Sequence, residues 1–167
     1  MTLDQILFYA FAGLALASAL VVIAQRNPMY SAFALIVTLC SLSGIYGLLG
    51  SPFIAVLQII VYAGAIMVLF LFVLMLLRVG PEAEGGGEGR VMKGVALALA
   101  VLFVLQAGTV IAGAGVGSGP EAYDASTRRL AELLFSPAFV YAFEAAAVLI
   151  LSALVGAVVL AKRDFES

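Results

Sequence analysis

The sequence predicts an all-α integral membrane protein with five transmembrane helices, and three observations support that prediction. Of the 167 residues, 65% are hydrophobic and only 11% are charged, whereas a soluble domain is about half apolar and a quarter charged. The mean hydropathy is +1.21. The charged residues also divide the chain into long uncharged runs, each near or above the roughly 20 residues that a helix needs to cross a bilayer. We treat residues 1–167 as a single membrane domain.

The first predicted span covers about residues 4–25. It is uncharged from Gln5 to Gln25 and is bounded by Asp4 and Arg26, which gives about the minimum length for a transmembrane helix. The Asn27-Pro28 pair that follows is typical of a turn that leads into a new helix.

The next uncharged run is too long for one helix. No charged residue occurs from Asn27 to Leu77, a stretch of 51 residues. The sequence GLLGSP at positions 47–52 interrupts this run, because glycine and proline favour turns over helices. Span two is therefore predicted at about 29–49 and span three at 52–77, joined by a tight hairpin.

The remaining chain alternates between polar and apolar segments. Residues 79–92 are rich in Gly and Glu and are predicted to form a flexible aqueous loop. Span four is predicted at about 94–113. A short amphipathic helix is predicted at about 126–136, because its leucines recur with helical spacing, and we expect it to lie at the membrane interface. Pro137 is predicted to start span five, which covers about 138–161.

The basic residues are distributed unevenly over the two sides of this topology. The side that receives the C-terminus holds six of them, Arg26, Arg78, Arg90, Lys93, Lys162 and Arg163, and the other side holds Arg128 and Arg129. Because cytoplasmic loops carry the excess of Lys and Arg, we expect the C-terminus in the cytoplasm and the N-terminus outside.

Glu144 is the one charged residue in the interior of a predicted span, seven residues past Pro137. A charge at that depth costs about 3 kcal/mol on insertion scales, so it needs a partner, a water-filled cavity or a proton. One interpretation is a proton-relay or ion-pair site whose partner belongs to another subunit. The other is a glutamate near the interface that bonds a neighbouring helix or reaches the lipid headgroups. Both interpretations stay open at this stage.

Polar and small residues interrupt span three and mark a second candidate site. Gln58 and Tyr62 are four residues apart and so share one face of an α-helix. Gly64 is the point at which that helix is least constrained. Tyr62 is either a hydrogen-bonding phenol on a helix that changes its local winding, or an ordinary tyrosine beside a close-packing glycine. Further glycines are predicted to mark close helix crossings: Gly44, Gly47 and Gly113.

The composition excludes several functional classes. One cysteine and no histidine exclude an internal disulfide and the usual zinc and haem ligand sets. A net charge of −2 argues against nucleic acid as a partner. The sequence has no dinucleotide-binding fingerprint and no phosphate-binding loop motif. We therefore expect no catalytic residue, no metal and no cofactor in this chain, and a lipid bilayer around it.

Three segments resemble one known family. Residues 57–77, LQIIVYAGAIMVLFLFVLMLL, are similar to the signature of subunit J of bacterial NADH-quinone oxidoreductase, whose mitochondrial counterpart is NADH dehydrogenase chain 6. Residues 139–163, FVYAFEAAAVLILSALVGAVVLAKR, resemble the closing helix of that family. Asn27-Pro28 is a weaker third match, and the three segments together cover about a third of the chain.

The resemblance implies a core membrane subunit of respiratory complex I in the bacterial inner membrane. That complex passes electrons from NADH to a quinone and pumps protons, and its FMN and iron–sulfur clusters lie in partner subunits. The family is known for a π-turn in its third helix that switches between π and α winding, and by motif this turn falls at residues 62–65 here. We hypothesise that this turn gates a proton path, and the predicted site residues are Tyr62, Gly64, Met67, Val68 and Glu144.

Two other functions stay open at the level of sequence. One is a passive structural subunit of the same complex, needed for assembly but not for coupling. The other is a small independent proton-coupled exchanger that uses Glu144 as its carrier carboxylate. Compact multidrug exchangers work in that way, but they carry their glutamate in the first of four spans.

Overall fold

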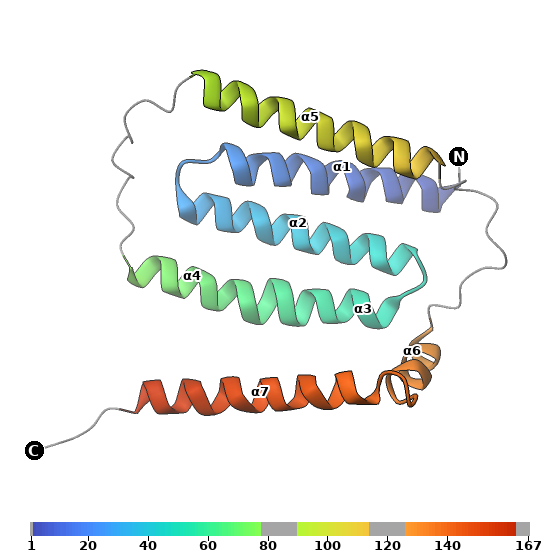
Figure 1. Cartoon of the computed structure of the whole chain (residues 1–167), viewed down its shortest axis with the longest axis vertical. Helices are drawn as coiled ribbons and strands as arrows, with labels where there is room; N and C mark the ends of the chain where they lie inside the picture. Colours follow the sequence, from blue (N-terminus) through green and yellow to red (C-terminus); the bar gives the residue numbers. More distant parts are fainter. Residues whose placement is uncertain (1, 78–89, 114–125, 163–167) are drawn as a thin grey trace, which may run out of the picture.

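The computed structural model describes residues 2–77, 90–113 and 126–162 of the chain, and the regular structure in these ranges is helical. The elements in chain order are α1 (Leu3–Ala24), α2 (Pro28–Leu48), α3 (Pro52–Leu57), the π-wound segment η1 (Gln58–Ile66), α4 (Met67–Leu76), α5 (Arg90–Gly113), α6 (Thr127–Leu134) and α7 (Val140–Ala161). Figure 1 shows that α3, η1 and α4 form one continuous rod, called the third helix below (Pro52–Leu76).

Five helices are long and apolar enough to cross a membrane, namely α1, α2, the third helix, α5 from Gly94 onward, and α7. This confirms the predicted class and the predicted five long apolar helices. α1 and α2 each begin and end one residue earlier than predicted. Uncharged length sets these boundaries closely, because the charged residue or turn at each end cannot enter the apolar interior of a membrane.

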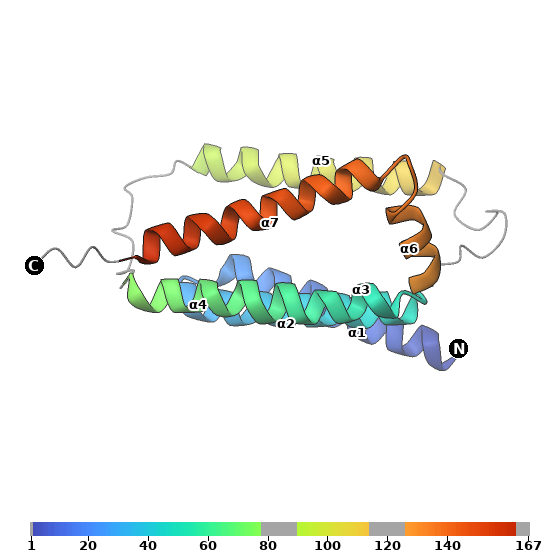
Figure 2. The ribbon, with the colours of Figure 1, turned by 90° about the horizontal axis from the view of Figure 1, so that it is seen from below.

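The helices form two groups in space. α1, α2 and the third helix lie side by side in one layer, called the N-terminal layer below, with α2 in the middle and in contact with both neighbours (Figures 1 and 2). α5 and α7 lie outside this layer on one side of it (Figure 2). α6 lies across one end of the molecule, between the start of the third helix and the start of α7.

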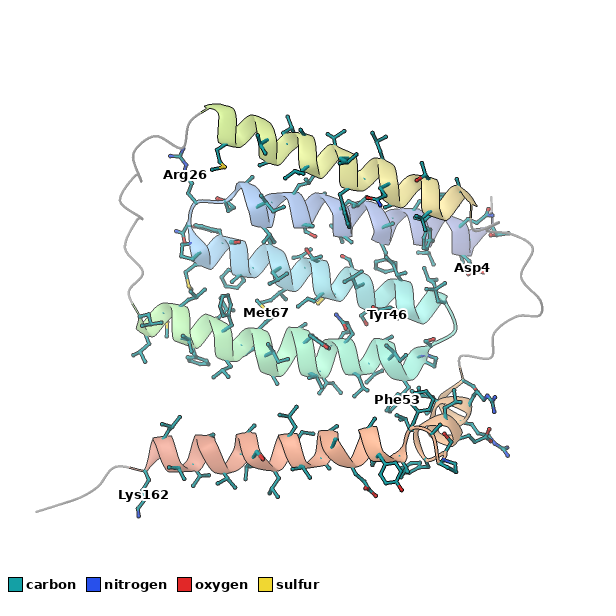
Figure 3. All side chains as sticks on the ribbon, in the orientation of Figure 1. Asp4, Arg26, Tyr46, Phe53, Met67 and Lys162 are labelled. Carbon is teal, nitrogen blue, oxygen red and sulfur yellow. The ribbon has the colours of Figure 1, made fainter. Side chains whose placement is uncertain are left out.

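The two ends of the helices carry different charged residues. Arg26 and Lys162 lie at one end, whereas Asp4 and α6 lie at the other (Figure 3). Five alternating spans require this arrangement, because the turn after the first span and the end of the fifth must share a side. Arg78 and Arg163 of the predicted basic side lie outside the described residues.

Hydroxyl groups join α1 to α2. The hydroxyls of Ser18 and Thr38 share a hydrogen bond of 2.8 Å, and the Ser31 hydroxyl donates to the Val22 carbonyl at 2.8 Å. Hydrogen bonds between membrane helices are worth about 0.6–2 kcal/mol each, so these contacts fix the register of the two helices.

A glycine brings α1 closer to α2. A Cβ placed on Gly44 would lie 2.8 Å from the ring carbon Cε1 of Phe11, so the ring rests directly on the α2 backbone. The close crossing predicted at Gly44 is therefore present. A Cβ on Gly47 or Gly113 would meet no described atom within 4 Å, so the crossings predicted there do not occur among the described helices.

α2 begins at a local cap. The Asn27 side chain accepts a hydrogen bond of 3.0 Å from the Met29 N–H, and Pro28 occupies the first helical position. Asparagine is a preferred N-cap residue, and proline has no N–H to leave unsatisfied there.

α2 ends in the predicted tight hairpin. Gly50 has a φ of +75°, and its N–H donates to the Gly47 carbonyl while the Ser51 N–H donates to the Tyr46 carbonyl. This is the Schellman pattern of helix termination, in which a glycine adopts the left-handed conformation just past the helix end. The third helix then starts at Pro52.

Three further boundaries differ from the prediction by two residues or more, and one of them is the end of α6, at Leu134 instead of residue 136. Residues 90–92, predicted as loop, are the first turn of α5, and residues 79–89 of the same predicted loop lie outside the described residues. α7 begins at Val140 instead of at Pro137 or residue 138, because the Ser136 carbonyl accepts from the N–H groups of both Phe139 and Val140 in a turn between α6 and α7.

Candidate functional site

The third helix changes its winding between Gln58 and Ile66. In this nine-residue segment the backbone forms a π-helix, in which an N–H group bonds to the carbonyl five residues before it. At the end of the segment the Met67 N–H bonds to the carbonyl of Tyr62, five residues earlier, as well as to that of Gly64. The flanking segments α3 and α4 are ordinary α-helix.

Gly64 lies where the widened turn leaves little room for a side chain. A Cβ placed on Gly64 would lie 3.1 Å from the carbonyl oxygen of Ile59, five residues earlier, which is tighter than most real Cβ contacts. This oxygen faces Gly64 because the segment is π-wound. A side chain at position 64 would therefore crowd the backbone of the segment in its π winding. The π-turn that the family resemblance implies at residues 62–65 lies within the longer segment.

The side chains around the π segment lie on different sides of the rod. Ala63 and Met67 are 8% and 4% exposed, and Met67 lies on the side of the third helix that faces α2 (Figure 3). Tyr62 and Val68 are 51% and 46% exposed. The structure therefore brings the predicted residues Tyr62, Gly64, Met67 and Val68 together along one rod but not onto one face. Met67 packs within this chain, whereas Tyr62 and Val68 lie on its surface.

Glu144 is an exposed residue near the start of α7, outside the N-terminal layer. Beside it the rings of Phe143 and Phe135 pack edge to face with centroids 5.1 Å apart, and this contact holds the start of α7 against the end of α6. Within the described ranges no hydrogen bond or ion pair joins Glu144 to another side chain, including Tyr62. The structure thus does not unite the two sites that the sequence indicated.

Ser43 was missed by sequence reasoning. Its side chain is 4% exposed, and its hydroxyl donates a 2.6 Å hydrogen bond to the Ala55 carbonyl in α3. Serine hydroxyls inside helices often bond to the carbonyl four residues earlier in the same helix, as Ser41 does with Val37 at 2.8 Å. The one available signal was the run of hydroxyl residues at 38–43 in an otherwise apolar span, and it does not say which hydroxyl reaches the next helix.

The described part of the chain contains no group of three or more His, Cys, Asp or Glu side chains that could hold a metal ion.

The charged residues of α6 pair with each other. Glu132 accepts from Arg128 at 3.2 Å and from Arg129 at 3.4 Å, with all three side chains at least half exposed.

Comparison with known proteins identifies the family. The profile of NADH-ubiquinone/plastoquinone oxidoreductase chain 6 matches residues 18–160. The chain belongs to this family. NADH-quinone oxidoreductase subunit J of Pseudomonas aeruginosa is 38% identical over 94% of this chain and 96% of its own length. Subunit J of Rhodobacter capsulatus is 33% identical over 98% and 84%, and subunit J of Escherichia coli is 38% identical over 89% and 81%.

Membership in the subunit J/chain 6 family confirms the resemblance drawn from residues 57–77 and 139–163. The chain is a multi-pass membrane subunit of NADH-quinone oxidoreductase, complex I, and the other subunits of that complex are its partners. The π-wound segment Gln58–Ile66 is thus a feature of a membrane subunit of complex I.

Proposed function

We propose that this subunit couples quinone reduction to proton translocation through a change of winding in its third helix. NADH, FMN, the iron–sulfur clusters and the quinone are bound by partner subunits, and this chain carries no redox centre. The observation that supports this proposal most directly is the π-wound segment Gln58–Ile66 inside an otherwise α-helical rod. π segments are rare, and those that interrupt α-helices frequently lie at functional sites.

A change from π to α winding shifts the register between the two ends of the third helix by one residue. α4 then rotates relative to α3 by about 100°, the angle that one α-helical residue subtends. Met67, which is 4% exposed and packs toward α2, leaves its position, and a neighbouring residue replaces it. Such an exchange of apolar side chains wets or dries an adjoining proton path, with Tyr62 and Val68 at its edge.

Glu144 is assigned to the same proton path. It is exposed on α7 and has no partner among the described side chains. A carboxylate in an apolar span needs a partner or a proton, and in the assembled enzyme we expect another subunit to supply one. The alternative role, a glutamate that reaches the interface, is consistent with its position four residues past Val140, and the two roles give different results when the charge is removed.

The orientation follows from the basic residues. Arg26 and Lys162 share one end of the molecule, and α6 lies at the other (Figure 3). By the positive-inside rule the first end faces the cytoplasm, which places the C-terminus inside and α6 at the outer interface of a bacterial inner membrane. A reporter fused after residue 167 that is active only on the outer face would contradict this orientation.

Gly64→Val tests the change of winding. The added side chain would press on the Ile59 carbonyl in the π form, so we expect it to favour α winding throughout the third helix. We expect proton uptake linked to quinone reduction to fall strongly in membrane vesicles, while oxidation of NADH by a hydrophilic acceptor stays normal. Gly47→Val is the matched control, because a Cβ there meets no described atom within 4 Å.

Full proton pumping by an assembled Gly64→Val enzyme would contradict the proposed gate and favour a passive structural role for the subunit. Ion transport by the purified chain alone would favour the independent exchanger based on Glu144. Co-purification with an assembly that carries flavin and iron–sulfur absorbance is the result that the family membership predicts.

A further inference from the structure

The third helix is held to the rest of the chain by a single polar contact within the described residues. The Ser43 hydroxyl donates to the Ala55 carbonyl at 2.6 Å, and no other side-chain hydrogen bond reaches Pro52–Leu76. Ser43 is 4% exposed, so no water competes for this bond. The remaining contacts between α2 and the third helix are apolar packing, which has no fixed direction.

The contact between Ser43 and Ala55 lies just before the π segment. Ala55 lies in α3, three residues before the π segment begins at Gln58. The Gln58 N–H bonds to the carbonyls of Ala55 and Ile54, so the last turn of α3 closes on the same carbonyl that Ser43 holds. The contact therefore fixes the end of α3 just before the winding changes.

α2, which provides Ser43, is itself fixed on its opposite side. The residue next to Ser43 is Gly44, on which the Phe11 ring rests, and the hydroxyls of Ser18 and Thr38 join the same two helices. α2 is thus a rigid reference for the third helix. On the other side of the π segment the described residues show no polar contact between α4 and α2.

We propose that Ser43 is a positioning residue that anchors α3 to α2, so that a change of winding in the π segment rotates α4 and leaves α3 in place. The proposal rests on the proposed function for its consequence, because the anchor matters for coupling only if the winding changes. An unanchored α3 would share the rotation, and the side-chain exchange at Met67 would be incomplete.

Hydrogen–deuterium exchange of the intact enzyme, read by mass spectrometry, tests the anchor. Ser43→Ala removes the hydroxyl and leaves the Ala55 carbonyl without it. We expect amide exchange in residues 54–60 of the resting enzyme to rise by about 5- to 10-fold, the increase in open population that follows the loss of one buried hydrogen bond. The ratio of protons taken up to NADH oxidised should fall as well, and this ratio does not depend on how much enzyme is assembled.

Ser41→Ala is the matched control. Ser41 is 2% exposed, lies two residues away on α2 and bonds to the Val37 carbonyl of its own helix. The substitution Ser41→Ala should leave unchanged both the amide exchange in residues 54–60 and the ratio of protons taken up to NADH oxidised. The anchor is contradicted if Ser43→Ala does not accelerate exchange in that segment, or if Ser41→Ala accelerates it equally. It is also contradicted if α1 and α2 exchange faster to the same extent, which indicates general loosening.

A separate measurement distinguishes failure of the anchor from failure of the proposed function. Exchange in residues 66–72 of the unmodified enzyme, compared between rest and turnover, reports the winding change in α4. If exchange in residues 66–72 is the same at rest and during turnover, the proposed change of winding is contradicted. The anchor would then have no role in coupling. The hydrogen bond between Ser43 and the Ala55 carbonyl is tested separately, by amide exchange in residues 54–60 of the resting enzyme.

Discussion

The N-terminal layer and the two long helices outside it, α5 and α7, are similarly apolar but differently packed. The buried residues of the described chain all lie in the layer: Ala15, Ser18, Ala32, Ser41, Ser43, Ala63 and Met67. None lies among the described side chains of α5, α6 or α7. α5 from Gly94 onward and α7 are nevertheless long and apolar enough to span a membrane, as are the helices of the layer. Apolarity thus decides that a helix enters the membrane but not which helix it contacts.

The reason is that lipid tails are as apolar as leucine, so burying a leucine between two membrane helices gains little. Six of the seven buried residues are Ala or Ser, which allow close backbone approach and interhelical hydrogen bonds. α7 also carries small residues, but a Cβ on its Gly156 meets no described atom within 4 Å. Small residues therefore permit packing, and a complementary neighbour is needed to complete it.

The largest expected effect tests this contrast with one substitution in each group. Gly44→Val places a branched side chain against the Phe11 ring, which already lies 2.8 Å from an ideal Cβ. We expect overpacking of about 1–3 kcal/mol and a clear loss of assembled complex I, measured by native gel electrophoresis of solubilised membranes. Gly156→Val on α7 should be tolerated. Equal damage by Gly156→Val would show that another subunit packs on that face of α7.

Removing the charge of Glu144 has the next largest expected effect. Glu144→Gln should leave NADH oxidation by a hydrophilic acceptor intact and lower the proton uptake linked to quinone reduction severalfold, because the carboxylate is assigned to the proton path. Proton uptake in membrane vesicles is the measurement. Glu132→Gln on α6 is the control, since that carboxylate already pairs with two arginines. Unchanged proton uptake in Glu144→Gln would favour the interfacial role.

The smallest expected effect concerns the Ser18–Thr38 hydrogen bond within the N-terminal layer. A double-mutant cycle of Ser18→Ala and Thr38→Val should give a coupling free energy of about 0.6 kcal/mol, the average for such bonds in membrane proteins. The change in thermal stability of the purified complex is the measurement. Ser152→Ala on α7 removes a hydroxyl that bonds only within its own helix. An equal loss of stability in Ser152→Ala would contradict the distinction between the two groups.

Most of the fold was predictable because local chemistry decides it. Charged residues end the apolar runs, Asn27-Pro28 starts α2, and Gly50 before Ser51-Pro52 forms the hairpin. The start of α7 was predicted less well. Proline at position 137 is compatible with a first helical turn, but the Ser136 carbonyl instead closes a turn that contains it.

The candidate site was only partly predictable. Gly64 stands out in the sequence because it removes an obstacle to a wider turn, and the family resemblance implied a π-turn around it. Nothing in the sequence indicates that the π segment extends from Gln58 to Ile66. The residues that flank it, Leu57 and Met67, have ordinary right-handed helical φ and ψ values, so π and α winding differ in hydrogen-bond register more than in local conformational preference.

The sequence alone determined the number of long apolar helices and most of their ends, because these depend on the transfer of single side chains between water and lipid. Only the tertiary structure decided which small residues are buried, that Ser43 and not Ser41 reaches the third helix, and that Met67 faces α2 while Tyr62 does not. These features depend on the distance and angle between neighbouring helices. The same apolar pattern is compatible with many such arrangements.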